Sequence, residues 1–309
     1  MNISKRISRF INHWWALPGK ISKIQESLGR IEARQIQNLA PDQINNSEFR
    51  VYSQWGEDGI IQYLLKYVPI ENKTFVEFGV ENYKEANTRF LLVNNNWTGL
   101  VMDGSSENID YIKNDMSVSY AYNLKADCVF IAKDNINEVI TRNGISGDTG
   151  ILSVDIDGND YWIWEAITCI NPRIVICEYN SLFGPSAKVC TPYKPDFYRE
   201  TAHFSNLYYG VSIAAWEYLA KKKGYSLVGA NSAGNNVFFV RNDVCGPLKI
   251  QTSAEAYVEA QFKEAKDING KLTYVDFDAR LKEVADLEVV DVENNRLIKI
   301  SDLNNIIGN

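Results

Sequence analysis

The apolar positions in the middle of the chain fall into short runs that alternate with helical segments. Between the runs, the apolar spacing predicts helices near Glu85–Asn95, Asn135–Arg142 and Tyr161–Ile167. The runs themselves are rich in Val, Ile and Phe, are bounded by turn residues, and predict strands over Thr74–Phe78, Gly99–Asp103, Ile151–Asp155 and Arg173–Glu178. Strands that alternate with helices are typical of a doubly wound parallel sheet.

This order changes before residue 241. A predicted helix over Ser212–Lys223 leads into a strand over Tyr225–Gly229, and a short turn then leads into a second strand over Val237–Val240. Strands joined by so short a loop pair antiparallel, because a parallel crossover needs about a dozen residues or more. We therefore expect a mostly parallel sheet that ends in one antiparallel hairpin.

Two flanking segments have a different pattern. Residues 1–48 predict an amphipathic helical arm, in which Ile21, Ile24, Leu28 and Ile31 have the spacing of a heptad seam over only two heptads. A packing arm or a contact between two copies of the chain is the expected role. Residues 49–245 predict the sheet domain, and residues 246–309, polar and rich in acids, predict an appended element.

Composition places the chain among globular proteins, with 309 residues of which 45% are apolar and 23% charged. No stretch approaches the ~20 uninterrupted apolar residues that span a bilayer, and Asn12 and His13 interrupt the first apolar run, so we expect no secretory signal. Five cysteines without a CxxC spacing disfavour a disulfide framework or a structural zinc site. Reduced thiols in a cytoplasmic protein fit better.

The net charge of −7 is unevenly divided. Residues 1–34 carry seven basic side chains against Glu26 and Glu32, a net of +5, so the remainder must carry −12. An acidic body argues against a general nucleic-acid binder, since neutralising phosphates needs a basic surface. The basic leader could contact an anionic membrane or a partner, or could simply be a solvated helix.

Two predicted strands end in groups that suit a nucleoside without phosphates. Glu77, Gly79 and Asn82 lie at or just beyond the end of the first strand, where open α/β sheets bind ligands. A pyrophosphate site would need GxGxxG, whereas acids beside a single glycine suit a cation such as S-adenosylmethionine. Asp103 ends the next strand and is placed to accept the hydroxyls of a ribose, or to help begin the helix near residue 106.

The strongest chemical signal comes from two later strand ends. Asp155 and Asp157 are expected to point to one side by strand alternation, and Glu178 and Asn180 end the strand that we expect beside theirs. Carboxylates this close disfavour ionising together unless a cation lies between them. Mg²⁺ or Mn²⁺ is the natural partner of such oxygen ligands, so Asp155, Asp157 and Glu178 are the predicted metal ligands.

Two further residues are candidates with a plain structural alternative. His203 lies in an aromatic-rich stretch and could take a proton from an acceptor hydroxyl, or could be an ordinary half-buried histidine. Ser53 lies in a polar loop that could fold over the cofactor, or could cap the helix that follows.

Six stretches in order resemble the FkbM-like family of class I S-adenosylmethionine-dependent methyltransferases. They are SQWGEDGI (Ser53–Ile60), VEFGV (Val76–Val80), ANTRFL with WTGLVMDGS (Ala86–Ser105), LSVDIDGNDYWIWEA (Leu152–Ala166), RIVICEYN (Arg173–Asn180) and KKGYSLVGANSAGNNVFFVR (Lys222–Arg241). The resemblance covers about residues 50–241 and implies a Rossmann-like α/β fold with a seven-stranded sheet. It also implies that Glu77 and Gly79 lie by the methionine portion of the cofactor and that Asp103 holds its ribose. The chain departs from many methyltransferases in having one glycine where they have three.

The resemblance further implies methylation of oxygen. We therefore expect an S-adenosylmethionine-dependent O-methyltransferase that acts on a sugar or nucleotide-activated sugar of a surface polysaccharide precursor. A divalent metal would assist, with Asp155 in catalysis and His203 or a carboxylate taking the proton. Two alternatives stand beside this. The sequence Asp155-Ile156-Asp157 could be the DxD of a metal-dependent glycosyltransferase, or the fold could serve as a binding module without chemistry, anchored by the basic leader.

Overall fold

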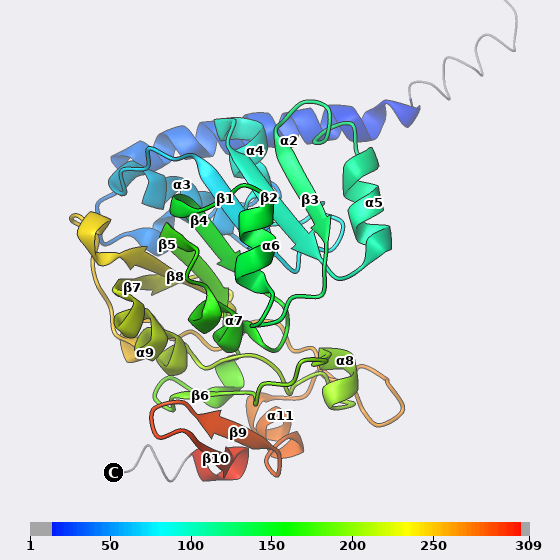
Figure 1. The fold of residues 1–309 in the computed structure, drawn as a ribbon, viewed down its shortest axis with the longest axis vertical. Coiled ribbons are helices and arrows are strands. Elements are labelled where there is room, and N and C mark those ends of the chain that lie inside the picture. The colour runs from blue at the N-terminus through cyan, green and yellow to red at the C-terminus, as the bar shows by residue number, and fades with distance from the viewer. Residues whose placement is uncertain (1–13, 304–309) are drawn as a thin grey trace, which may run out of the picture.

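The computed structural model describes residues 14–303, and a central sheet crosses the middle of the molecule (Figure 1). Among these residues, seven strands form this sheet: β1 (Thr74–Phe78), β2 (Thr98–Asp103), β3 (Leu124–Cys128), β4 (Gly147–Val154), β5 (Ile170–Glu178), β7 (Tyr225–Ala230) and β8 (Asn236–Arg241). Their order is β3-β2-β1-β4-β5-β8-β7. Strand β8 runs antiparallel to both neighbours, and the other neighbouring pairs are parallel. This confirms the predicted fold class, a Rossmann-like class I methyltransferase fold with an antiparallel terminal hairpin.

Helices cover both faces of the sheet, as alternation along the buried strands requires. Within residues 14–303 the helices, on the sheet and elsewhere, are α2 (Leu17–Gln35), α3 (Glu57–Tyr67), α4 (Arg89–Asn95), α5 (Ser106–Asn114), α6 (Ile136–Arg142), α7 (Asp160–Ala166), α8 (Arg199–Ala202), α9 (Ile213–Lys223), α10 (Ser253–Ala256) and α11 (Phe277–Glu283). Strand β1 illustrates the layering. Its Phe75 joins the apolar cluster under α3, α4 and α5, and its Val76 joins the opposite cluster, with α6, α7 and α9.

Two predicted boundaries differ from the structure in ways that affect the site. Strand β4 ends at Val154, so Asp155 lies just beyond the strand rather than within it. Helix α4 begins at Arg89 and not near Glu85. The residues before it form a loop in which Glu81 and Tyr83 have positive φ values of 47° and 61°, conformations that cannot continue into a helix.

Helix α2 (Leu17–Gln35) of the N-terminal arm lies along one end of the molecule (Figure 1). Helix α2 begins at Leu17 and has Pro18 in its first turn, where a proline costs no helical hydrogen bond. The predicted seam Ile21, Ile24, Leu28 and Ile31 is exposed to solvent. The basic residues Lys5, Arg6 and Arg9 of the leader lie outside the described residues.

Strands β9 (Glu288–Asp291) and β10 (Arg296–Lys299) and helix α11 of the appended element lie at the opposite end (Figure 1). Strands β9 and β10 form a small antiparallel sheet with β6 (Val189–Cys190). A strand from residues 49–245 therefore pairs with one from residues 246–309, and the division of the chain into these parts stays a prediction. No helix within residues 14–303 combines the length and the hydropathy that a membrane crossing requires.

Candidate functional site

The candidate site lies at the topological switch point of the sheet, where the order in which strands are added reverses. Strand β1 has β2 on one side and β4 on the other. The chain therefore adds β2 and β3 on one side of β1 and then returns to the other side of β1, where β4 pairs with β1 and β5 pairs with β4. Open α/β sheets bind ligands beyond the carboxyl ends of the strands at such a point.

Gly79 directly follows β1 and lies against Asp155, which directly follows β4. Its φ is +75°, and its backbone N–H donates to the carbonyl oxygen of Met102, at 3.0 Å. A Cβ at this position would lie 1.6 Å from the carbonyl oxygen of Asp155, so only glycine fits. The residue predicted to adjoin a cofactor is thus in backbone contact with a residue predicted to bind a metal.

Glu77 is buried and faces the N-terminus of α4. Its carboxylate accepts hydrogen bonds from the backbone N–H groups of Asn87, at 2.9 Å, and Thr88, at 3.1 Å, and from the Thr88 hydroxyl. Burial raises the pKa of Glu77 above its ordinary value, and these hydrogen bonds partly oppose the rise. Glu77 therefore anchors the loop after β1, and its role beside the methionine portion of a cofactor stays a prediction.

Asp103, at the end of β2, ties the first two strand ends together. One carboxylate oxygen accepts from the backbone N–H of Glu81, at 2.8 Å, and the other from that of Ser105, at 2.8 Å, and from the Asn108 amide, at 3.1 Å. Asn82 lies in the same loop, half-buried, and accepts from the N–H of Lys84. The N-cap of α5 is Ser105, so Asp103 supports the helix start without capping it. A carboxylate can accept about four hydrogen bonds, which leaves Asp103 capacity for a ligand.

Ser53 acts in the local structure before α3. Its backbone N–H and hydroxyl both donate to Asp58, at 2.8 and 3.1 Å, and its hydroxyl accepts from the N–H of Asp58. Burial raises the pKa of Asp58 to about 6. Ser53 is completely buried, and its predicted contact with a cofactor stays a prediction.

The neighbouring Glu57 was not singled out from the sequence. It accepts from the side-chain amides of Asn231, at 2.6 Å, and Asn236, at 2.9 Å, and so links the start of α3 to the β7–β8 hairpin. No local pattern signals this contact, because the partners lie more than 170 residues away along the chain, with separations of 174 and 179.

Three carboxylates converge beyond β4 and β5. One oxygen each from Asp155, Asp157 and Glu178 lies within 4.8 Å of the other two. Glu178 is the last residue of β5, and Val154 pairs with Cys177, which brings the two strand ends side by side. Strand alternation does not explain the position of Asp157, which lies in a turn after the strand with a φ of +57°. The turn itself brings Asp157 back toward Asp155.

The three carboxylates repel one another when they are ionised. Burial, followed by the charge of Asp157, raises the pKa of Asp155 well above its ordinary value. Burial, followed by the charge of Asp155, does the same to the pKa of Glu178. Ionised together, these groups need positive charge nearby.

Arg199 of α8 supplies part of that charge, and sequence reasoning missed it. Its guanidinium pairs with Asp157 at 2.5 Å, stacks over the ring of Tyr209 at 3.6 Å from the ring centroid, and donates through Nε to the carbonyl of Asn206. Burial opposes the charged form of Arg199, but Tyr209, Asp157 and Glu178 together raise its pKa. The signal in the sequence would have been a basic residue in the aromatic stretch before Tyr209.

Two polar residues beside the cluster serve the backbone. Asn180 donates its amide to the carbonyls of Leu207 and Tyr209, each at 3.0 Å, and accepts from the N–H of Leu182, so it holds the segment below Arg199. Asp160, the first residue of α7, accepts from two N–H groups of the loop between Asp155 and α7, each at 2.7 Å. Burial raises the pKa of Asp160 to about 6.

His203 follows α8 and packs on Phe204, with 4.3 Å between the ring centroids. Its Nδ1 lies 2.7 Å from the hydroxyl of Ser205 and accepts from the backbone N–H of Ser205, at 3.4 Å. Because Nδ1 accepts, we assign the proton of the neutral ring to Nε2. Burial lowers the pKa of His203, against the charge of Glu283. These contacts are with Phe204 and Ser205 and not with the carboxylates, and the role of His203 as a base stays a prediction.

Comparison with known proteins gives a likeness of fold alone. No protein-family model matches the chain, and no curated protein matches it by sequence. The N-terminal domain of EvdMO1 with SAH bound is 10% identical and has a TM-score of 0.40, over 70% of this chain and 95% of that one. PKMT2 from Rickettsia typhi in complex with AdoHcy is 11% identical, with a TM-score of 0.40 over 60% of this chain and 52% of that one. A putative caffeoyl-CoA O-methyltransferase from Staphylococcus aureus is 13% identical, with a TM-score of 0.39 over 70% of this chain and 98% of that one.

Identities and TM-scores this low carry no argument about chemistry, so the donor groups of the site itself must decide what it could hold. The carboxylate cluster fits a hard divalent cation. All three donors are oxygens, two of them have pKa values that burial and mutual repulsion raise, and Arg199 pairs directly with Asp157 alone of the three.

Proposed function

We propose that the protein is an S-adenosylmethionine-dependent O-methyltransferase that acts on a hydroxyl of a sugar or nucleotide-activated sugar, with help from Mg²⁺ or Mn²⁺. The observation that carries the proposal is the backbone contact of Gly79 with Asp155. It makes the loop that would hold a nucleoside and the cluster that would hold a cation parts of one site, at the switch point of the sheet.

The donor groups around Gly79 favour this cofactor over a dinucleotide. Glu77, Glu81 and Asp103 surround the loop, and carboxylates repel a pyrophosphate while they attract an ammonium or sulfonium group. Asp103 would hold the ribose hydroxyls, and the loop from Gly79 to Asn82 would lie along the methionine portion. When bound, S-adenosylmethionine supplies an activated methyl group.

The carboxylate cluster would prepare the acceptor. A divalent cation would be held by Asp155, Asp157 and Glu178. When bound, it would act as a Lewis acid that lowers the pKa of the acceptor hydroxyl. Vicinal hydroxyls of a sugar suit such a site, because two oxygens of one molecule can bind one cation. Asp155 would take the proton of the acceptor hydroxyl on a carboxylate oxygen, since the ring nitrogen that His203 could offer already accepts from Ser205. Alignment of the reacting groups could contribute ~7–11 kcal/mol.

One assay tests the whole proposal. The protein is incubated with S-adenosylmethionine, Mn²⁺ and a panel of nucleotide-activated sugars, and products are examined by mass spectrometry for a methyl increment. We expect a methylated sugar from wild-type protein, a rate at least ~100-fold lower for Asp155→Ala, and little change for the control Glu71→Gln, which alters an exposed loop acid.

Calorimetry separates the alternatives. Binding of nucleotide sugars without binding of S-adenosylmethionine would favour a glycosyltransferase. Binding of S-adenosylmethionine without turnover of any acceptor would favour a binding module. Activity that EDTA leaves unchanged in wild type and Asp155→Ala alike would exclude the metal.

A further inference from the structure

Helix α2 exposes an apolar stripe from Leu17 to Ile31, over most of its length. Leu17, Ile21, Ile24, Leu28 and Ile31 recur every three or four residues, which places them on one face of the helix. Their exposed fractions lie between 44% and 61%. Trp14 and Trp15 precede the stripe and are 67% and 77% exposed. A run of large apolar side chains in water at one surface marks an interaction site.

A different face of α2 attaches the helix to the rest of the protein. Gly29 is buried against Val51 and Phe90, and a Cβ there would lie 2.4 Å from a Val51 methyl group. The Gln25 amide donates to the carbonyl of Val51, at 2.8 Å, and the Tyr52 hydroxyl donates to Glu26, at 2.7 Å. Small and polar residues therefore hold α2 in place, and the apolar stripe is not needed for packing.

Basic side chains flank the stripe. Lys20, Lys23, Arg30 and Arg34 are exposed, and in residues 14–303 none of them forms an ion pair. On a helical wheel they occupy the sector beside the stripe, away from the face of Gly29. The thirteen residues before Trp14 add three basic side chains and no acidic one. The exposed surface of α2 is thus both apolar and positively charged.

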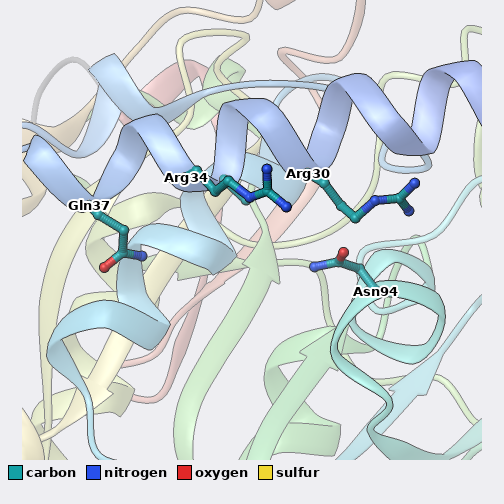
Figure 2. A pocket seen from close by; sticks show the side chains of 5 residues that line it. Arg30, Arg34, Gln37 and Asn94 are labelled. Carbon is teal, nitrogen blue, oxygen red and sulfur yellow. The ribbon is translucent and has the colours of Figure 1, made fainter.

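Two of these arginines line a hollow of about 230 Å³ between α2 and the end of α4. Figure 2 shows Arg30, Arg34 and Gln37 along one side of the hollow and Asn94 on the other. Guanidinium and amide groups donate hydrogen bonds to phosphate oxygens. The hollow has the chemistry of a site for a phosphate group.

A second copy of the chain suits this face poorly. The seam from Leu17 to Ile31 is about two heptads long, which is short for a stable coiled coil. With the stripe at the a and d positions of a heptad, an antiparallel pair would bring Lys20 of one copy near Arg34 of the other, and these two positive charges repel each other. A parallel pair would set Lys20 against Gln25 and Ser27 against Glu32, so neither arrangement forms an ion pair across the seam.

We propose that α2 docks the protein on the surface of a bilayer that contains anionic phospholipids. The helix would lie in the plane of the interface, with the stripe among the acyl chains and the basic residues against the headgroups. A lipid phosphate would occupy the hollow at Arg30 and Arg34. The remainder of the chain carries −12, which an anionic surface repels, so contact is confined to the arm. This inference does not depend on the proposed function.

Vesicle flotation with the full chain tests the proposal. Vesicles of phosphatidylcholine with about one third phosphatidylglycerol are compared with phosphatidylcholine alone, at ~0.1 M and ~0.5 M salt. The test variant is Ile24→Asp with Leu28→Asp. The matched control is Ile268→Asp with Leu297→Asp, which changes two residues that are 78% and 54% exposed elsewhere. Equal thermal unfolding midpoints for both variants and wild type establish that the fold is intact.

The wild type and the control should float with anionic vesicles at low salt and should not float with neutral ones. The Ile24→Asp, Leu28→Asp variant should bind at least ~100-fold more weakly. Arg30→Gln with Arg34→Gln should weaken binding about 25-fold, since each basic residue near an anionic surface contributes about fivefold.

Three results would overturn the proposal. One is wild-type protein that ignores anionic vesicles, and another is equal binding by wild type and the Ile24→Asp, Leu28→Asp variant. The third is a dimer in sedimentation equilibrium that this variant abolishes, since a second copy would then cover the stripe.

Discussion

Replacing Glu178 by glutamine should affect stability in opposite directions without and with a divalent cation. In the free protein, Glu178→Gln removes one of three carboxylates whose oxygens lie within 4.8 Å of one another. Two unit charges at that distance repel by about 3 kcal/mol at an effective dielectric constant of about 20. Partial exposure and Arg199 reduce this, so we expect a gain of about 1 kcal/mol, or about 2 °C in the unfolding midpoint.

A bound cation reverses the comparison. At a concentration of Mn²⁺ about 100 times its dissociation constant, the wild type should gain about 2.7 kcal/mol, or about 5 °C. The variant lacks one of the three oxygen ligands and should gain much less. The wild type should therefore be the less stable protein in EDTA and the more stable one in Mn²⁺.

The pH dependence of the EDTA measurement follows from the pKa shifts. Burial and the other carboxylates raise the pKa of Glu178 and of Asp155 in the folded protein. An acid with a raised pKa loses stability as the pH rises from its ordinary pKa through its folded pKa. The advantage of Glu178→Gln should thus grow as the pH rises through the folded pKa of Glu178, and it should be absent below pH ~3, where this carboxyl group is protonated in both states.

Thermal unfolding followed by circular dichroism provides the assay, with Glu71→Gln as the control for loss of an exposed acid. The reasoning fails if Glu178→Gln lowers the midpoint in EDTA at pH 8. It also fails if Mn²⁺ raises the midpoints of both proteins equally.

Four further predictions test separate parts of the account. Arg199→Gln removes the ion pair with Asp157 and should lower stability in EDTA by about 1–3 kcal/mol in urea unfolding, while tightening the binding of Mn²⁺; an equal loss in EDTA and in Mn²⁺ would contradict this. Gly79→Ala and Gly147→Ala both place alanine at a positive φ, 75° and 69°, but of the two only Gly79 faces a carbonyl oxygen. In urea unfolding, Gly79→Ala should therefore lose at least ~2 kcal/mol more stability than Gly147→Ala, and equal losses would refute the close approach of Gly79 to Asp155. His203→Ala should keep kcat within about fivefold of wild type from pH 6 to 9, whereas a ~100-fold loss would make His203 the base. The Arg173 side chain, with Arg241, holds the pKa of Asp148 below its ordinary value, so Asp148→Asn should lower the free energy of unfolding by about 1 kcal/mol at pH 7, after allowance for the 39% exposure of Asp148. This loss should disappear as the pH falls through the folded pKa of Asp148, below ~4, and a loss that persists there would contradict its origin in the ion pairs.

The buried part of the fold could be predicted from the sequence because burial leaves a clear pattern. Strand β1 was expected over Thr74–Phe78 and has those bounds, since an apolar run lies between polar turn residues. Strand β3, Leu124–Cys128, was not predicted. It lies at the edge of the sheet, is only partly buried, and contains Lys125 and Asp127, so its apolar signal is weak.

The predicted strand-end residues meet because parallel strands share an edge. Asp155 directly follows β4 and Glu178 ends the adjacent strand β5, so their proximity follows from strand order alone. The contribution of Arg199 could not be predicted in this way. It lies 42 residues from Asp157 along the chain, and stacking on Tyr209 sets its position.

The conformation of the loop after β1 also required the structure. Sequence spacing extended the next helix back to Glu85, whereas Glu77 binds the N–H groups of Asn87 and Thr88 and so fixes the start of α4. A side chain that satisfies backbone groups ten residues away leaves no periodic trace in the sequence.

A crystal grown with MnCl₂ and S-adenosylhomocysteine gives the most direct test of the central claim, through anomalous scattering from manganese. We predict one manganese peak in contact with Asp155, Asp157 and Glu178, and a ribose within hydrogen-bond distance of Asp103. A crystal in which the three carboxylates bind no manganese while the nucleoside lies away from Asp103 would contradict it.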